Sequence, residues 1–153
     1  MAITGEHKTE HKTVAHPAHP AHPAKSGRYT EAVGRRKTAI ARVRIMAGTG
    51  KMTVNGKSLK EYFTLPRLMA DAKAPIEQLK LGDYDVQVIV KGGGIHAQAG
   101  AVRLGLSRAI VAVSPDWKPR LRTMGYLTRD SRMVERKKYG LNKARRAPQW
   151  AKR

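Results

Sequence analysis

The stretch 84-YDVQVIVKGGGIHAQAGAVRLGLSRAIVAV-113 decides the fold of this chain. The run from Tyr84 to Val90 predicts a β-strand that ends at Lys91 and the glycines after it. After the glycines Gly92 to Gly94, apolar residues recur every three or four positions from about Ile95 to Val113, which predicts a buried helix. Small residues on this helix, Gly105 among them, would let it lie close to a sheet. The stretch therefore indicates a mixed fold of one sheet packed against helices.

The residues before this stretch extend the same pattern. Thr38 to Ile45 alternates as a strand, with arginines on one face and apolar side chains on the other. Lys51 to Val54 predicts a second short strand. Ser58 to Phe63 has a helix-capping pattern, a serine followed three residues later by a glutamate. Leu65 to Leu79 predicts a further helical stretch, in which Pro75 is expected to divide the helix or begin a new one.

Charge limits the classes of function more than any other property of the composition. The chain has 153 residues and a formal net charge of +20, and such self-repulsion favours a polyanionic partner. The chain has no cysteine, which excludes disulfides and thiol catalysis. The chain contains no run of about 18 apolar residues, so the sequence predicts no membrane span. The first residues resemble neither a signal peptide nor a transit peptide, so we expect the protein in the cytoplasm.

Composition divides the chain into three segments. Residues 1–25 carry a net charge of +1 and include the repeat His16-Pro17-Ala18, His19-Pro20-Ala21, His22-Pro23-Ala24. This segment could be a weak metal or pH-sensitive site, but a disordered spacer is the better interpretation, because no acid or cysteine completes a ligand set. Residues 26–117 carry +8 and are predicted to form a globular α/β domain that binds RNA. Residues 118–153 carry +11 and are predicted to form an extended basic tail.

Two motifs in the globular segment suit phosphate binding. Gly34-Arg35-Arg36-Lys37 places three consecutive cations after a glycine, which fits contacts to an RNA backbone better than an exposed polar hairpin. Gly92 to Gly94 precedes a helix N-terminus, a place that suits a phosphate. An enzymatic nucleotide-binding loop is the weaker interpretation, because the spacing of known glycine-rich loops and nearby carboxylates are missing. The glycines could also serve a tight turn, and we expect both roles to share the loop.

The C-terminal segment has almost no apolar periodicity from Tyr126 to Arg153. Fully extended, these residues could reach on the order of 90 Å. The segment could be a nonspecific basic tail, or it could thread through folded RNA and become ordered there. Tyr139 and Trp150 could then stack on unpaired bases.

The order of these motifs resembles the small-subunit ribosomal protein S-nine family, in its bacterial form. The resemblance covers about residues 28–153. It is carried by GRRKTAIARV at 34–43, VNGK at 54–57, KGGG at 91–94, QAGAVRLGLSRA at 98–109, LTRDSRMVERKKYGLNKARR at 127–146 and QWAKR at 149–153.

This resemblance implies a fold and a role in translation. The expected fold is an α+β two-layer sandwich like the second domain of ribosomal protein S-five, with a left-handed βαβ crossover and the basic C-terminal tail. The expected protein is no enzyme and needs neither cofactor nor metal. It would be a structural constituent of the small-subunit head, in contact with ribosomal RNA, peptidyl-site tRNA and neighbouring head proteins, and with no membrane. A free-standing RNA-binding or chaperone module and a small-molecule kinase-like enzyme remain as alternatives.

The resemblance also assigns residues. The terminal pair Lys152 and Arg153 is expected to contact tRNA. Contacts to ribosomal RNA are expected from basic residues and glycines throughout residues 35–146: Arg35, Arg36, Lys37, Arg42, Arg44, Lys91, Gly92, Gly93, Gly94, Arg103, Arg108, Arg129, Arg132, Arg136, Lys137, Lys138, Lys143, Arg145 and Arg146.

Overall fold

A five-stranded mixed sheet forms one layer of the computed structural model, which describes residues 29–151. The strand order is β1-β2-β5-β3-β4. All neighbouring strands are antiparallel except β3 and β5, which are parallel. The histidine repeat and the pair Lys152 and Arg153 lie outside the described residues. The strands are β1 (Thr30–Arg36), β2 (Ala39–Ala47), β3 (Met52–Val54), β4 (Lys57–Ser58) and β5 (Tyr84–Lys91).

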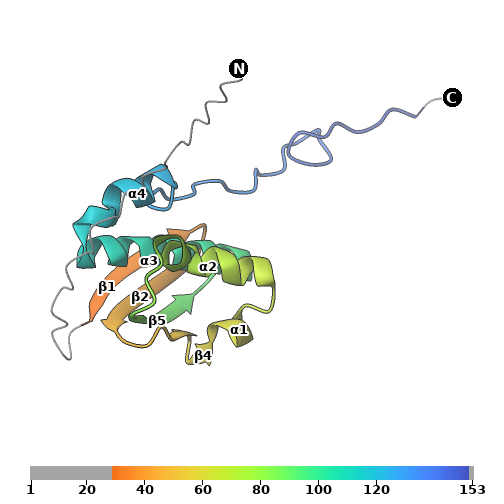
Figure 1. Cartoon of the computed structure of the whole chain (residues 1–153). Coiled ribbons are helices and arrows are strands. Elements are labelled where there is room, and N and C mark those ends of the chain that lie inside the picture. Colours follow the sequence, from red (N-terminus) through yellow and green to blue (C-terminus); the bar gives the residue numbers. More distant parts are fainter. Residues whose placement is uncertain (1–28, 152–153) are drawn as a thin grey trace, which may run out of the picture.

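Helices form the second layer. Figure 1 shows the two long helices, α2 and α3, lying together over one face of the sheet. The short helix α1 follows β4 near the sheet edge, and Ser58 caps it by accepting a hydrogen bond from the backbone N–H of Glu61. The helices are α1 (Leu59–Tyr62), α2 (Pro66–Leu79), α3 (Ile95–Val113) and α4 (Lys118–Thr123), with a 3₁₀ turn, η1 (Pro115–Trp117), before the last.

The core lies between the sheet and the helices. In β2, Ala41, Val43 and Ile45 are buried while Ile40 and Arg42 are exposed. In β5, Val86, Val88 and Val90 are buried in the same alternating way. Buried residues of α3 complete the core, with Val102, Leu106 and Ala109 fully buried. In β2 and β5 alternate side chains thus face the helices and are buried, while the others, polar ones together with Ile40 and Ile89, lie on the opposite face.

Glycines let α3 approach β1 at backbone distance. A Cβ atom on Gly34 would lie 1.9 Å from the carbonyl oxygen of Ala101 and 2.4 Å from the backbone nitrogen of Gly105. A Cβ atom on Gly105 would lie 2.7 Å from a methyl group of Val43. No side chain larger than hydrogen fits at either position without moving the helix or the strand.

These observations confirm an α+β fold with a mixed sheet packed against helices. The predicted helices at residues 58–63 and 95–113 and the strands at 38–45, 51–54 and 84–90 are confirmed within a residue or two. The prediction for Pro75 is wrong, because α2 runs unbroken through this residue. Pro75 lies near the end of α2 and shares its buried side with Leu68, Ala72 and Leu79, so packing of that side outweighs one lost hydrogen bond.

The globular part continues beyond residue 117. Leu121 of α4 is fully buried and belongs to the core, and Tyr126 and Leu127 pack against it. We therefore place the end of the globular part after residue 127. From Arg129 to Ala151 the chain has no helix or strand, and Figure 1 shows this segment leaving the domain.

The close approach at Gly34 gives the first prediction. Gly34→Ala should lower the free energy of unfolding by about 3 kcal/mol, because the added methyl group meets backbone atoms of α3. Gly82→Ala is the matched control, since a Cβ atom there has no neighbour within 4 Å. This control should change the stability by no more than about 0.5 kcal/mol. Urea unfolding followed by circular dichroism measures both, and equal stabilities of the two variants would contradict the packing described.

Candidate nucleic-acid interface

The sheet face opposite the helices gathers four of the predicted RNA contacts. The strand register places Arg35, Ile40 and Lys91 side by side across β1, β2 and β5. The next row on this face is Val33, Arg42 and Ile89, and the row after it is Glu31, Arg44 and Gln87. We call the surface formed by these three rows the open face.

The open face is both basic and apolar. Val33, Ile40 and Ile89 are 38%, 45% and 38% exposed, although large aliphatic side chains are usually buried. They alternate with the cations, so the face offers long arginine and lysine side chains between aliphatic ones. Nothing among the described residues covers it.

One carboxylate orders two of these arginines. Glu31 accepts hydrogen bonds from Nε of Arg42 and from Nε of Arg44, the latter over 3.0 Å. These hydrogen bonds hold the pKa of Glu31 below its usual value, and the one from Arg42 contributes most. The guanidinium of Arg44 also lies 4.7 Å from the centre of the Tyr29 ring. Glu31 therefore fixes the direction of both arginines at the edge of the open face.

The glycine loop lies directly beside the β1–β2 hairpin. Gly92 and Gly93 have φ angles of +70° and +68°, which favour glycine. A Cβ atom on Gly92 would lie 2.8 Å from the carbonyl oxygen of Thr38, in the turn between the two strands, and one on Gly93 would lie 2.8 Å from Cβ of Ala39, at the start of β2. The side chain of Gln98 donates a hydrogen bond to the carbonyl of Gly92 over 3.1 Å and so holds the loop. The two phosphate-binding motifs predicted from the sequence therefore lie next to each other in space.

Three of the arginines that are predicted to contact RNA also contact other residues of the protein. Arg108 donates a hydrogen bond to the carbonyl of Val33 over 2.9 Å. Arg103 lies 3.7 Å from a carboxylate oxygen of Asp71, and its guanidinium lies 5.5 Å from the centre of the Tyr126 ring. These contacts join α3 to β1, to α2 and to the residues after α4. Arg103 and Arg108 therefore have contacts within the domain, and their contacts with RNA stay a prediction.

Arg36 is the third of these residues and attaches the tail to the domain. Its side chain lies against Gly100 of α3, where a Cβ atom would be 2.4 Å from the Arg36 Cδ. Its guanidinium donates a hydrogen bond over 2.9 Å to Asp130, at the base of the tail. Asp130 also accepts hydrogen bonds over 3.0 to 3.1 Å from the backbone N–H and the guanidinium of Arg132. One carboxylate therefore links β1 to the start of the extended segment.

The rest of the tail presents its cations to solvent. The basic residues of this segment that are predicted to contact RNA are exposed and belong to no helix or strand: Arg129, Arg132, Arg136, Lys137, Lys138, Lys143, Arg145 and Arg146. Tyr139 and Trp150 are 98% and 90% exposed, so their rings are accessible for stacking. Lys152 and Arg153, the expected tRNA contacts, lie outside the described residues.

Sequence reasoning did not identify several residues of this interface. Glu31, Tyr29 and Asp130 became visible only with the strand register and the position of the tail. The prediction of an extended tail from residue 118 did not include the helix α4, whose cations Lys118, Arg120 and Arg122 are exposed. The apolar Leu121 between two arginines was the one signal of an ordered turn there.

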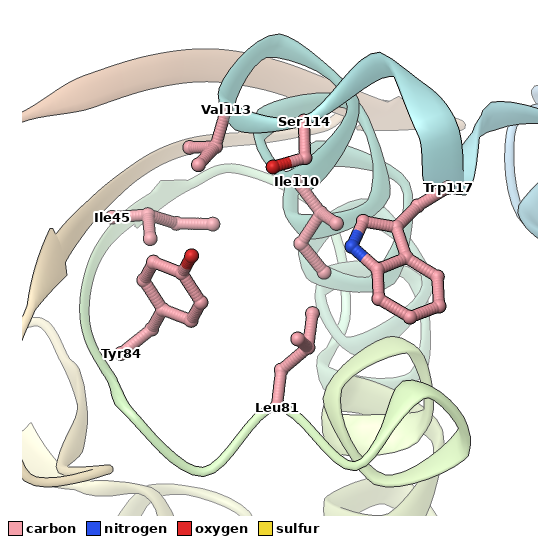
Figure 2. Close-up of a pocket in the computed structure, with 7 residues that line it drawn as sticks. All are labelled: Ile45, Leu81, Tyr84, Ile110, Val113, Ser114 and Trp117. Carbon is pink, nitrogen blue, oxygen red and sulfur yellow. The ribbon is translucent and has the colours of Figure 1, made fainter. Parts of the chain in front are cut away.

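Two cavities within residues 29–151 are too small for a small-molecule substrate. Figure 2 shows an apolar cavity between β2, the residues before β5 and the end of α3, with Ile45, Leu81 and Trp117 on its walls. Its volume is about 10 Å³, no more than a single water needs. A second cavity of about 10 Å³ lies beside Arg36 and Asp130. In the same range no helix is long and apolar enough to cross a membrane, and no three metal-ligating side chains gather.

Comparison with known proteins decides the family. The family model for ribosomal protein S9/S16 matches residues 34–153. The chain is 55% identical over 122 residues to the small ribosomal subunit protein uS9 of Nostoc punctiforme, covering 78% of this chain and 88% of the relative. It is 52% identical over 122 residues to the uS9 protein of a Cyanothece species, covering 78% of this chain and 89% of that relative.

The chain belongs to the ribosomal protein S9/S16 family. It is a structural ribosomal protein of the small subunit and acts in translation in the cytoplasm, which confirms the resemblance stated from the motifs. The family is not enzymatic, so the kinase-like alternative for the glycine loop is wrong. The positive φ angles and the contact with Thr38 and Ala39 explain Gly92 and Gly93 without a bound nucleotide.

The attachment of the tail of this ribosomal protein gives a prediction about pH. Hydrogen bonds from the side chain and backbone of Arg132 hold the pKa of Asp130 well below its usual value, and the charge of Arg36 lowers it further. Because the pKa is lowered in the folded chain, the attachment is complete above about pH 3.9, the unfolded value. It is lost as the pH falls through the lower folded value.

Carbon-13 NMR titration of Asp130 measures this effect. The midpoint should rise most in Arg132→Gln and less in Arg36→Gln, since Arg132 supplies the larger effect. A midpoint that stays the same in Arg36→Gln would contradict the attachment of the tail through Arg36.

Proposed function

We propose that this small-subunit protein binds ribosomal RNA through two basic surfaces, the open face and the tail. The observation that carries the proposal is the sorting of charge by the strands. Arg35, Arg42, Arg44 and Lys91 come from three strands, yet their paired positions put them on one uncovered face. A face of this kind suits a phosphate backbone, and the exposed aliphatic side chains between the cations suit ribose and base surfaces.

Arg35 and Lys91 are the cations of the open face that the protein itself leaves unpaired among the described residues. Arg42 and Arg44 share Glu31, whereas Arg35 and Lys91 have no carboxylate partner there. Lys37 is exposed in the same hairpin turn and is equally unpaired within this range. We therefore propose that RNA phosphates approach the domain most closely at Arg35, Lys37 and Lys91, beside the glycine loop.

We further propose that the tail reaches the peptidyl-site tRNA and that Lys152 and Arg153 contact it. The support is the family membership, the match of the family model through residue 153 and the course of the tail to Ala151 without helix or strand. We also propose that the connection from β3 to β5 is left-handed. These two strands pair in parallel, so the chain between them must cross over from one end of the sheet to the other. A free-standing RNA-binding or chaperone module would use the same surfaces without staying on the subunit.

Salt dependence tests the open face. If six to ten phosphates are bound, affinity for protein-free small-subunit ribosomal RNA should fall by roughly 10³ to 10⁵ between 50 and 200 mM salt. Arg35→Gln combined with Lys91→Gln should weaken binding and lower the slope of log affinity against log salt by about two, one for each lost phosphate contact.

A charge-matched variant controls this experiment. Lys57→Gln combined with Lys60→Gln removes two charges from exposed positions in β4 and α1, toward the opposite edge of the sheet. This control should keep the slope within about half a unit of the unchanged chain. Equal slopes for the two double variants would show that the open face is not the RNA-binding surface.

The end of the tail has a separate test. Deletion of Lys152 and Arg153 should leave assembly into small subunits nearly unchanged, because the cations from Arg129 to Arg146 remain. The same deletion should weaken tRNA binding at the peptidyl site by about ten-fold, because two exposed ion pairs contribute up to about 1 kcal/mol each. Filter binding of tRNA to reconstituted subunits measures the effect. Loss of assembly, with no specific effect on tRNA, would contradict the assignment.

A further inference from the structure

Glu135 is a carboxylate in a segment that is otherwise strongly basic. From Thr128 to Ala151 its only acidic companion is Asp130, which attaches the tail to the domain. One oxygen of Glu135 accepts a hydrogen bond from Nζ of Lys138 over 2.8 Å, and the other accepts one from Nε of Arg145 over 2.8 Å. A single side chain thus joins two cations that lie seven positions apart in the chain.

Backbone turns complete a closed loop between these contacts. The N–H of Leu141 donates to the carbonyl of Lys138 over 3.4 Å, with Gly140 at a φ of +71°, where glycine is favoured. The N–H of Asn142 donates to the carbonyl of Arg146 over 2.7 Å. Figure 1 shows this part of the tail turning back on itself before the chain runs on. We call residues 135–146 the basic loop.

The basic loop concentrates charge against its own repulsion. Its twelve residues include six cations and one carboxylate. Glu135 is bound to two of the cations, and the other four are exposed and have no partner among the described residues: Arg136, Lys137, Lys143 and Arg146. An extended chain would keep these charges apart, so an internal anion such as Glu135 is needed to hold the loop closed before RNA binds.

We infer that Glu135 is a positioning residue that closes the basic loop, so that the four free cations meet RNA phosphates as one preformed group. The inference rests on the proposed function, which supplies RNA as the partner. A carboxylate close to an RNA backbone is repelled by it, and its presence there is explained if it shapes the cations that bind. Preforming the loop lowers the ordering cost that a disordered tail would meet on binding.

Whether one substitution raises or lowers the affinity for RNA separates this account from simple charge attraction. Glu135→Gln raises the net charge by one, so attraction alone predicts tighter binding to RNA. Closure by Glu135 predicts weaker binding, by about five-fold if the closed fraction falls to one fifth. Affinity for protein-free small-subunit ribosomal RNA at fixed salt, measured by filter binding, gives the answer. Residue 135 lies outside the domain, so circular dichroism of the variant should be unchanged.

Glu77→Gln is the matched control. Glu77 is exposed on α2 and has no ion pair within residues 29–151, so its substitution adds the same charge without opening the loop. Binding of this variant should stay within about two-fold of the unchanged chain, because salt screens a distant surface charge. Glu135→Gln binding as tightly as Glu77→Gln would overturn the inference.

A second background tests whether Glu135 acts through its two partners. In a chain with Lys138→Gln and Arg145→Gln, the carboxylate has nothing to hold, so adding Glu135→Gln should no longer weaken binding and should instead strengthen it slightly. Weakening of equal size in both backgrounds would overturn the inference. If the unchanged chain itself bound ribosomal RNA no better than a 20-base-pair RNA duplex of arbitrary sequence, the proposed function would fail instead.

Discussion

The contact between the backbones of β1 and α3 is the constraint on which the rest of the structure depends. At Gly34 and Gly105 the two elements meet without side chains between them. This contact holds the longest helix flat on β1 and β2, where it covers Ala41, Val43 and their neighbours. With α2 beside α3, the apolar positions of the sheet are satisfied on one face. The opposite face is left without a layer of its own, and the alternation of the strands makes that face basic.

The same packing divides the cations of the protein into two groups. Arg36 of β1 and Arg103 and Arg108 of α3 each have a partner within the protein. Cations of the open face and the tail are mostly exposed, and several have no internal partner among the described residues. The few carboxylates near these cations, Glu31, Asp130 and Glu135, do not neutralise the surface; each holds two cations in a fixed direction. In a protein of net charge +20, acidic residues thus serve to shape the basic surfaces.

Local patterns in the sequence were enough to predict the central elements of the fold. The alternation in β2 and β5 and the spacing in α3 each reflect burial on one side, which the sequence records directly. β1 was not identified as a separate strand, because Gly34 and three cations hide its pattern, and its partner lies across a tight turn. The continuation of α2 through Pro75 and the helix around Leu121 depend on tertiary packing that outweighs local preference. The pairs of Arg36 with Asp130 and of Glu31 with Arg42 depend on register and on distant contacts, so no local signal could reveal them.

Sedimentation of the chain in a lysate of its own cells tests the central claim most directly, namely that these basic surfaces bind the protein into the small subunit. The account predicts that the chain sediments with small subunits in a sucrose gradient and remains with them after a high-salt wash, because many contacts from the open face and the tail act together. Recovery of the chain at the top of the gradient after that wash, with small subunits intact below it, would contradict the account and favour a free-standing RNA-binding module.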